Sequence, residues 1–199
     1  RQQSLRMENI VRDLLILSSL ETKGLTKTQD LIELITLFSE IENDTKQMFK
    51  DESHTFEIIC DPSLRLTGKR SEIYSAISNL VVNAAKYTPA GGHIQLSAEA
   101  NGGLFEIGVQ DDGIGIESHH IPRLTERFYR IDGSRSSDTG GTGLGLAIVK
   151  HILARHEGDL EISSTHGEGS RFICRLPLSR ASLEQSVSKT KTEALSTDT

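Results

Sequence analysis

The sequence predicts an α+β fold, with helices packed on one face of a largely antiparallel sheet. Residues 94–100 alternate between apolar and polar side chains, and a second apolar run at 105–109 follows the turn Asn101-Gly-Gly103. This pattern is typical of a β-hairpin. Helical patterns at residues 71–87 and 142–156 flank the hairpin, which favours a two-layer α/β sandwich.

An amphipathic helix is predicted for Ser4–Leu20, ahead of the main domain. Apolar residues recur there at three- and four-residue spacing, and Thr22-Lys-Gly24 ends the pattern. We expect residues 1–22 to be half of a helical hairpin or dimer bundle, and the alternative is a core helix of the main domain. A second amphipathic helix is predicted from Asp30 to Lys50.

The main domain is predicted to cover residues 31–178. Its helix at 71–87 has Ser71 as the expected N-cap. The polar connection 117–141, partly helical around 121–128, has the length of a lid. Residues 179–199 are rich in Ser and Thr and are predicted to be a disordered tail. Further strands are expected at 55–60, 64–67, 160–163 and 170–176.

The composition argues against several classes of protein. The formal net charge of −6 and the lack of a Lys/Arg cluster disfavour general nucleic-acid binding. No apolar run reaches the roughly 20 residues that span a bilayer, and there is no secretion signal. Cys60 and Cys174 lie far apart inside apolar strand-like runs, which favours free thiols in a reducing compartment.

Asn79 and Asn83 lie four residues apart in a predicted helix, so both amides project from one face. Amide oxygens are suitable ligands for Mg²⁺, which shares its other positions with water and phosphate. Lys86 and Tyr87 continue this face and are candidates for binding phosphate oxygens. The alternative is that the two amides are solvated or cap neighbouring turns.

A second polar segment, Asp111-Asp-Gly113-Ile-Gly115, follows the strand at 105–109. A carboxylate at a strand end accepts a hydrogen bond from an exocyclic amine such as that of adenine. The two glycines let the backbone pass close to a flat ring and adopt positive φ. A tight turn with solvated acids is the alternative.

A third segment, Gly140-Gly-Thr-Gly-Leu-Gly-Leu146, opens the helix at 142–156 and is the most specific of the three. Free backbone N–H groups at the start of a helix bind phosphate. The segment is no Walker loop and no dinucleotide fingerprint, because Gly68-Lys69 is followed by Arg70 and the third fingerprint glycine is missing. A Gly-rich structural hinge is the alternative.

In this order, the polar segments resemble the N, first glycine, F, second glycine and final glycine boxes of sensor histidine kinases. Residues 121–132 are in addition similar to the phosphate-regulon sensor kinases of Gram-negative bacteria. The resemblance implies the ATP-binding fold of histidine kinases and gyrases. Asp112 stands where the family often has Asn. The segments that carry the resemblance are Asn79…Asn83-Ala-Ala-Lys86-Tyr87-Thr88-Pro89, Asp111-Asp-Gly113-Ile-Gly115-Ile116, Glu126-Arg-Phe128-Tyr129-Arg130, Gly141-Thr-Gly-Leu-Gly-Leu146 and Gly167-Glu-Gly-Ser170-Arg-Phe172.

The resemblance further implies a site for ATP and Mg²⁺. Asn83 would coordinate Mg²⁺ between the phosphates, with Asn79 beside it, and Asp111 would bind the adenine amine. Lys86 and Arg130 join Asn83 as candidate catalytic residues. The other residues implied to contact the nucleotide are Tyr87, Gly113, Gly115, Gly141, Thr142, Gly143, Leu144 and Gly145.

Kinase chemistry is preferred over ATP hydrolysis because of one residue. Relatives of this fold that hydrolyse ATP place a Glu where this chain has Asn79, and an amide is no general base at neutral pH. The family's acceptor histidine stands in a His-Glu/Asp-x-Arg/Lys-x-Pro context that none of the seven histidines has. Since Ser4–Leu20 resembles the second helix of the acceptor hairpin, the acceptor is expected before Arg1, and this chain is not expected to phosphorylate itself.

The resemblance also implies transfer of the γ-phosphoryl group to that histidine, in the same or a partner protomer, for relay to a response regulator. The full-length protein is expected to be a homodimer in the inner membrane. This chain is expected to be part of its cytoplasmic portion, without contact to membrane or nucleic acid. Two alternatives stay open: a self-contained ATPase or chaperone-like module of the same superfamily, and a non-catalytic scaffold that dimerises through Ser4–Leu20.

Overall fold

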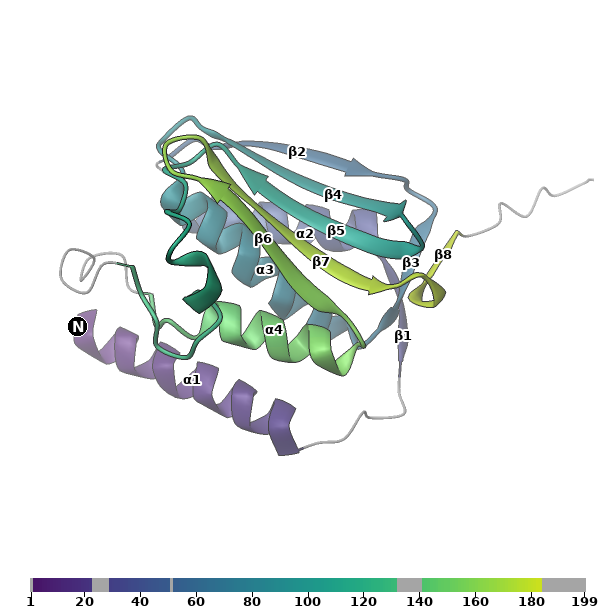
Figure 1. Cartoon of the computed structure of the whole chain (residues 1–199), viewed down its shortest axis with the longest axis horizontal. Coiled ribbons are helices and arrows are strands. Elements are labelled where there is room, and N and C mark those ends of the chain that lie inside the picture. Colours follow the sequence, from purple (N-terminus) through teal and green to yellow (C-terminus); the bar gives the residue numbers. More distant parts are fainter. Residues whose placement is uncertain (1, 23–28, 51, 132–140, 184–199) are drawn as a thin grey trace, which may run out of the picture.

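A computed structural model describes residues 2–22, 29–50, 52–131 and 141–183, and its centre is a five-stranded sheet with the order β2-β4-β5-β7-β6 (Figure 1). Neighbouring strands are antiparallel except β2 and β4, which run parallel. The predicted hairpin is the β4–β5 pair, and Gly102 and Gly103 adopt positive φ in its turn. The strands are β2 (Thr55–Cys60), β4 (His93–Asn101), β5 (Leu104–Asp111), β6 (Asp159–Thr165) and β7 (Gly169–Pro177).

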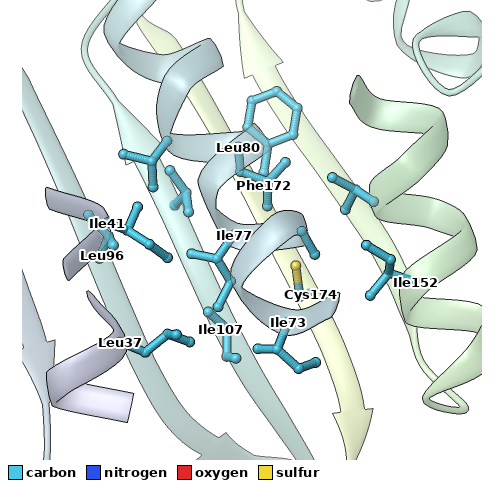
Figure 2. Packing of buried hydrophobic residues seen from close by; sticks show 14 of the residues in the cluster. Leu37, Ile41, Ile73, Ile77, Leu80, Leu96, Ile107, Ile152, Phe172 and Cys174 are labelled. Carbon is cyan, nitrogen blue, oxygen red and sulfur yellow. The ribbon is translucent and has the colours of Figure 1, made fainter. Parts of the chain in front are cut away.

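Three helices cover one face of this sheet: α2 (Leu34–Met48), α3 (Arg70–Tyr87) and α4 (Gly145–Arg155) (Figure 1). On α3 the buried residues Ile73, Ile77 and Leu80 recur at helical spacing, so one side of the helix is apolar. The predicted two-layer sandwich is confirmed. Figure 2 shows the core that α3 shares with α2, the sheet and α4, including Leu37, Ile41, Leu96, Ile107, Ile152, Phe172 and Cys174.

A second, three-stranded antiparallel sheet has the order β1-β3-β8 and contains β1 (Asp30–Glu33), β3 (Leu64–Gly68) and β8 (Ala181–Leu183). The prediction of a helix from Asp30 is wrong in its first turn. Ile32 is buried opposite Leu66, while its neighbours point outward, which is the alternation of a strand. Pairing with β3, distant in sequence, overrides the local helical pattern.

Part of the predicted tail, residues 179–183, has regular structure. Leu178–Arg180 form a 3₁₀ turn that leads into β8, and Leu64 of β3 pairs with Leu183. Residues 184–199 lie outside the described residues. Short strands of this kind gain their stability from the partner strand, so composition alone does not reveal them.

The start of α3 differs from the prediction as well. Ser71 is expected as the N-cap, but the helix begins at Arg70 and Lys69 is in the cap position. The carboxylate of Asp30 accepts a hydrogen bond from the backbone N–H of Arg70 at 2.9 Å. This satisfies one of the unpaired N–H groups of the first turn from a different element. Because this capping residue belongs to β1, the sequence around the start of α3 does not reveal it.

The connection from β5 to α4 contains little regular structure among its described residues. A 3₁₀ turn at Ile121–Arg123 replaces the longer helical segment expected at 121–128. The hydroxyl of Tyr129 lies 2.6 Å from Nδ1 of His120, and the guanidinium of Arg123 lies 4.2 Å from the centre of the Tyr129 ring. Residues 132–140 lie outside the described residues, so the lid stays a prediction.

Helix α1 (Gln2–Thr22) packs on α4, on the side away from the sheet (Figure 1). Leu17 and Leu20 are buried, whereas Met7, Val11 and Leu15 are 68%, 54% and 66% exposed. The predicted apolar stripe is therefore divided: its end packs against the domain and its beginning points outward. Within the described residues, no helix combines the length and the apolar character that crossing a membrane requires.

Candidate functional site

The C-terminal half of α3 carries the first group of predicted site residues. Asn79 and Asn83 lie one turn apart on this helix. The Nδ2 amide of Asn79 donates a hydrogen bond to the carbonyl of Ser75 at 2.8 Å. Its Oδ1 lies next to Gly145, where a Cβ atom would stand only 2.6 Å away. The missing side chain at Gly145 thus lets the start of α4 approach α3.

The Gly-rich loop immediately precedes α4, which begins at Gly145 and not at Thr142 as predicted. Gly143 has a φ of +73°, and its carbonyl accepts a hydrogen bond from the N–H of Phe128 at 2.8 Å. A Cβ atom at Gly143 would lie 2.9 Å from the Phe128 backbone. Glycine is therefore required both by conformation and by space. The loop lies at the positive end of α4, which suits an anion.

Two cationic side chains approach the same loop. Nη1 of Arg130 donates to the carbonyl of Gly141 at 2.9 Å. Nζ of Lys86 lies 2.7 Å from where a Cβ of Gly141 would stand, and 5.0 Å from the centre of the Tyr87 ring. Burial, and to a smaller degree the charge of Arg130, lower the pKa of Lys86. Two cations that disfavour each other's charge are stabilised by an anion such as phosphate.

At the other end of the site, Asp111 closes β5 with only 6% of its surface exposed. Its Oδ1 accepts a hydrogen bond from the backbone N–H of Gly113 at 2.9 Å. Burial raises the pKa of Asp111, while hydrogen bonding with the backbone of Gly113 and Ser170 acts in the opposite direction. A largely desolvated carboxylate of this kind is suited to a neutral N–H donor such as an exocyclic amine.

The turn after Asp111 is fixed against the end of α3. The N–H of Ile114 donates to the carbonyl of Tyr87 at 3.1 Å. A Cβ atom at Gly113 would lie 2.5 Å from that same carbonyl oxygen. Gly115 has a φ of +64°, and a Cβ there would overlap the carbonyl of Thr165. Both glycines are thus required where the turn approaches its neighbours.

Helix α3 is therefore the element on which the predicted segments meet. The turn after Asp111 lies at its end, and the Gly-rich loop lies along Asn79 and Lys86. One predicted contact residue has a different place: Leu144 is fully buried in the core, and its N–H donates to the hydroxyl of Thr142 at 3.2 Å. Its side chain packs the loop onto the domain and does not line the site.

The donor set on α3 fits a magnesium ion. Oδ1 of Asn79 faces the Gly-rich loop, as its Nδ2 is engaged by Ser75. Asn83 is half-buried one turn later, and its amide makes no hydrogen bond within the described part of the chain. Two amide oxygens beside the Gly-rich loop are appropriate for Mg²⁺, which takes its remaining ligands from phosphate and water.

Two serines near the carboxylate were not among the predicted site residues. The hydroxyl of Ser164 donates to the carbonyl of Gly169 at 2.7 Å, accepts the N–H of Ile116 at 2.8 Å, and lies 3.0 Å from the hydroxyl of Ser170. Ser170 pairs with Asp111 between β5 and β7. These hydroxyls hold the glycine turn against the sheet. Ser170 belongs to the final glycine segment and could have been noticed, but nothing in the sequence marks Ser164.

Comparison with known proteins gives a consistent result. Residues 68–180 match the family described as histidine kinase-, DNA gyrase B-, and HSP90-like ATPase. The chain is 47% identical to the phosphate regulon sensor protein PhoR of Pseudomonas aeruginosa, over 87% of this chain and 39% of PhoR. It is 36% identical to the sensor-like histidine kinase SenX3 of Mycolicibacterium smegmatis, over 88% of this chain and 46% of SenX3. The chain thus spans less than half the length of these curated relatives.

Among solved structures, full-length ShkA in complex with AMPPNP is similar to this chain, with a TM-score of 0.74. The identity is 22%, and the likeness covers 85% of this chain and 35% of ShkA, so it establishes the fold. The names of the sequence relatives confirm the resemblance to sensor histidine kinases, including that to the phosphate-regulon sensor kinases.

Proposed function

The chain belongs to the family of histidine kinase-, DNA gyrase B-, and HSP90-like ATPases, and we propose that it is the ATP-binding catalytic part of a sensor histidine kinase. One observation carries this proposal. Segments distant in sequence meet on α3 and present a buried carboxylate, a pair of cations with a Gly-rich loop, and two amides. A nucleoside triphosphate with a divalent cation offers a partner to each of these groups.

In this proposal the purine binds at the Asp111 end of the site. The carboxylate accepts a hydrogen bond from the exocyclic amine of adenine, and guanine, which has a carbonyl oxygen at that position, is disfavoured. The backbone at Gly113 and Gly115 carries no side chain that would shield the ring. The exposed ring of Tyr87, at the end of α3, lies beside the turn and is available to the ribose or the base.

The triphosphate binds at the other end of the site. Backbone N–H groups of the Gly-rich loop and of the start of α4 receive the phosphate oxygens, apart from the N–H of Leu144, which donates to the hydroxyl of Thr142. Lys86 and Arg130 add positive charge and stabilise the negative charge of the transferring phosphoryl group. Asn83, with Asn79 beside it, would hold Mg²⁺, which supplies further stabilisation of charge on the phosphate oxygens.

The chemistry at Asn79 supports transfer to a protein acceptor over hydrolysis. Its amide has no proton-accepting function at neutral pH, and its Nδ2 is already committed to the carbonyl of Ser75. Water is therefore not activated at this position. Phosphoryl transfer depends mainly on positioning and on stabilisation of charge, and the rest of the site supplies both. The nucleophile is then brought to the site by the acceptor protein.

The acceptor in this proposal is a histidine of a helical hairpin, in the same or a second protomer. The outward apolar side chains of α1, among them Met7, Val11 and Leu15, support its place in such a bundle within a homodimer. The phosphoryl group is then passed to a response regulator. We assign the chain to the cytoplasmic portion of an inner-membrane sensor protein, in keeping with its phosphate-regulon relatives.

Incubation with γ-labelled ATP tests the proposed reaction. The chain alone is expected to gain no acid-labile phosphate, because none of its histidines has the acceptor surroundings. After addition of a helical hairpin that carries the acceptor histidine of the full-length protein, labelled phosphohistidine is expected on the hairpin. Steady release of inorganic phosphate by the chain alone, abolished in Asn79→Ala, would instead identify a self-contained ATPase.

A further inference from the structure

A hydrogen bond joins α1 to the loop that precedes α4. The hydroxyl of Thr142 donates to Oδ2 of Asp13 at 2.7 Å. The same hydroxyl accepts the N–H of Leu144 at 3.2 Å. Asp13 therefore brings a carboxylate to the start of α4, where the helix end favours negative charge. This is the position at which the proposed function places the triphosphate.

Other contacts hold α1 in this position. Leu17 and Leu20, one and two turns after Asp13, are buried against the domain. Nη1 of Arg155, at the end of α4, donates to the carbonyl of Leu20 at 3.0 Å. The two helices thus run in the same direction, joined by Asp13 at the start of α4 and by Leu20 at its end (Figure 1).

We propose that Asp13 takes the place of a phosphate group at the Gly-rich loop, so that docking of α1 and binding of a nucleoside triphosphate oppose each other. The inference rests on the proposed function, because the opposing ligand is the same triphosphate. Its physical basis is that two anions compete for one hydroxyl and one helix end. When a phosphate group binds at the Gly-rich loop, Asp13 either repels it and so lowers the affinity for the triphosphate, or moves away together with α1.

The coupling acts in both directions. If docking of α1 weakens nucleotide binding by some factor, nucleotide binding weakens docking of α1 by the same factor. Nucleotide binding at the site therefore weakens the docking of α1 on the domain. Since the outward face of this helix carries Met7, Val11 and Leu15, release of α1 changes the orientation of the surface proposed to pack in the helical bundle.

Titration with AMPPNP and Mg²⁺ tests this inference on three forms of the chain. Asp13→Asn retains the size of the side chain and an oxygen acceptor for Thr142 but removes the charge. Glu8→Gln is the matched control, since it makes the same change of charge on α1 where Glu8 pairs with Arg12 at 3.2 Å. D13N is expected to bind AMPPNP about three- to tenfold more tightly than wild type, and E8Q within about twofold of wild type.

Leu17→Ala provides a second measurement, because it weakens the packing that holds α1 near the loop. It is expected to tighten AMPPNP binding by itself and to reduce the effect of D13N when the two are combined. Hydrogen exchange of the α1 amides 14–20 is expected to become faster when AMPPNP binds to wild type, with a smaller change in D13N.

The outcomes separate the two proposals. If wild type binds AMPPNP but D13N binds with the same affinity, or E8Q gains as much as D13N, the inference about Asp13 is wrong and the proposed function stands. If neither wild type nor D13N binds AMPPNP, the proposed function is wrong and the inference falls with it.

Discussion

Asp111→Asn is expected to weaken binding of AMPPNP by about 10- to 100-fold. In the wild-type chain Oδ1 of Asp111 accepts the N–H of Gly113, and an ionised carboxylate has further lone pairs that can accept an incoming amine. An asparagine that keeps the hydrogen bond to Gly113 presents its own NH₂ group to the adenine amine. Two hydrogen-bond donors then face each other without an acceptor. The expected loss of affinity is that of one hydrogen bond to a charged group, together with the cost of leaving the NH₂ group of the asparagine and the adenine amine unpaired. Calorimetric titration measures it.

The same substitution is not expected to destabilise the empty protein. Burial raises the pKa of Asp111 above its usual value of 3.8. Its ionised form therefore disfavours the folded state at neutral pH, and this effect decreases as the pH falls below the raised pKa and is lost below about 3.8. A neutral asparagine removes it at all pH values. Urea unfolding without nucleotide is expected to give a free energy of unfolding equal to or slightly above that of wild type.

Asp112→Asn is the control for charge. Asp112 is exposed and its Oδ1 accepts the N–H of His93 at 2.8 Å, so the variant is expected to bind AMPPNP within about twofold of wild type. An inosine analogue, which has a carbonyl oxygen in place of the exocyclic amine, is expected to bind wild type weakly and D111N more tightly, because the NH₂ group of the asparagine can donate to that oxygen. Asp111 is not the base contact if D112N loses as much affinity as D111N, or if D111N binds the inosine analogue far more weakly than wild type does.

Gly115→Ala is expected to lower the free energy of unfolding by about 3 kcal/mol or more. Gly115 has a φ of +64°, which disfavours any L-residue with a side chain, and the new Cβ would overlap the carbonyl of Thr165. The carbonyl belongs to β6 and has little freedom to move away. Because Gly115 also shapes the turn after Asp111, AMPPNP binding is expected to weaken as well. Urea unfolding with and without AMPPNP measures both effects.

Gly167→Ala separates backbone strain from steric overlap. Gly167 has a φ of +87°, but no atom lies within 4 Å of where its Cβ would stand. Its N–H donates to the carbonyl of Ile114, so it lies against the same turn as Gly115. The variant is expected to lose only about 1 kcal/mol of stability, the cost of positive φ alone. Equal losses in G115A and G167A would show that overlap at Thr165 contributes nothing.

Much of the fold was predictable because its periodicity is local. The hairpin β4–β5 shows strict alternation around two glycines, and α3 shows an apolar side of Ile73, Ile77 and Leu80. The predicted site followed from residue chemistry: an amide pair on one helix face, a carboxylate at a strand end and glycines before a helix. The structure adds that all of these meet on α3, which spacing within each segment did not establish.

The features that escaped prediction depend on contacts between distant segments. Asp30 begins β1 and at the same time caps α3, and only the packing of β1 beside β3 brings it there. Leu144 lies among glycines that are suited to a phosphate site, but its apolar side chain is buried in the core. Asp13 lies 129 positions before Thr142, and no local sequence pattern predicts their contact. In each case tertiary packing decided the outcome.

The role assigned to the amides of α3 is tested most directly by the dependence of nucleotide binding on Mg²⁺. Calorimetric titration of AMPPNP is made in Mg²⁺ and again in EDTA, with wild type and with Asn83→Ala. Wild type is expected to bind at least about tenfold more tightly in Mg²⁺, and Asn83→Ala is expected to lose most of that difference. No binding by wild type in Mg²⁺, or the same affinity with and without the cation, would contradict a site in which α3 holds a triphosphate through a divalent ion.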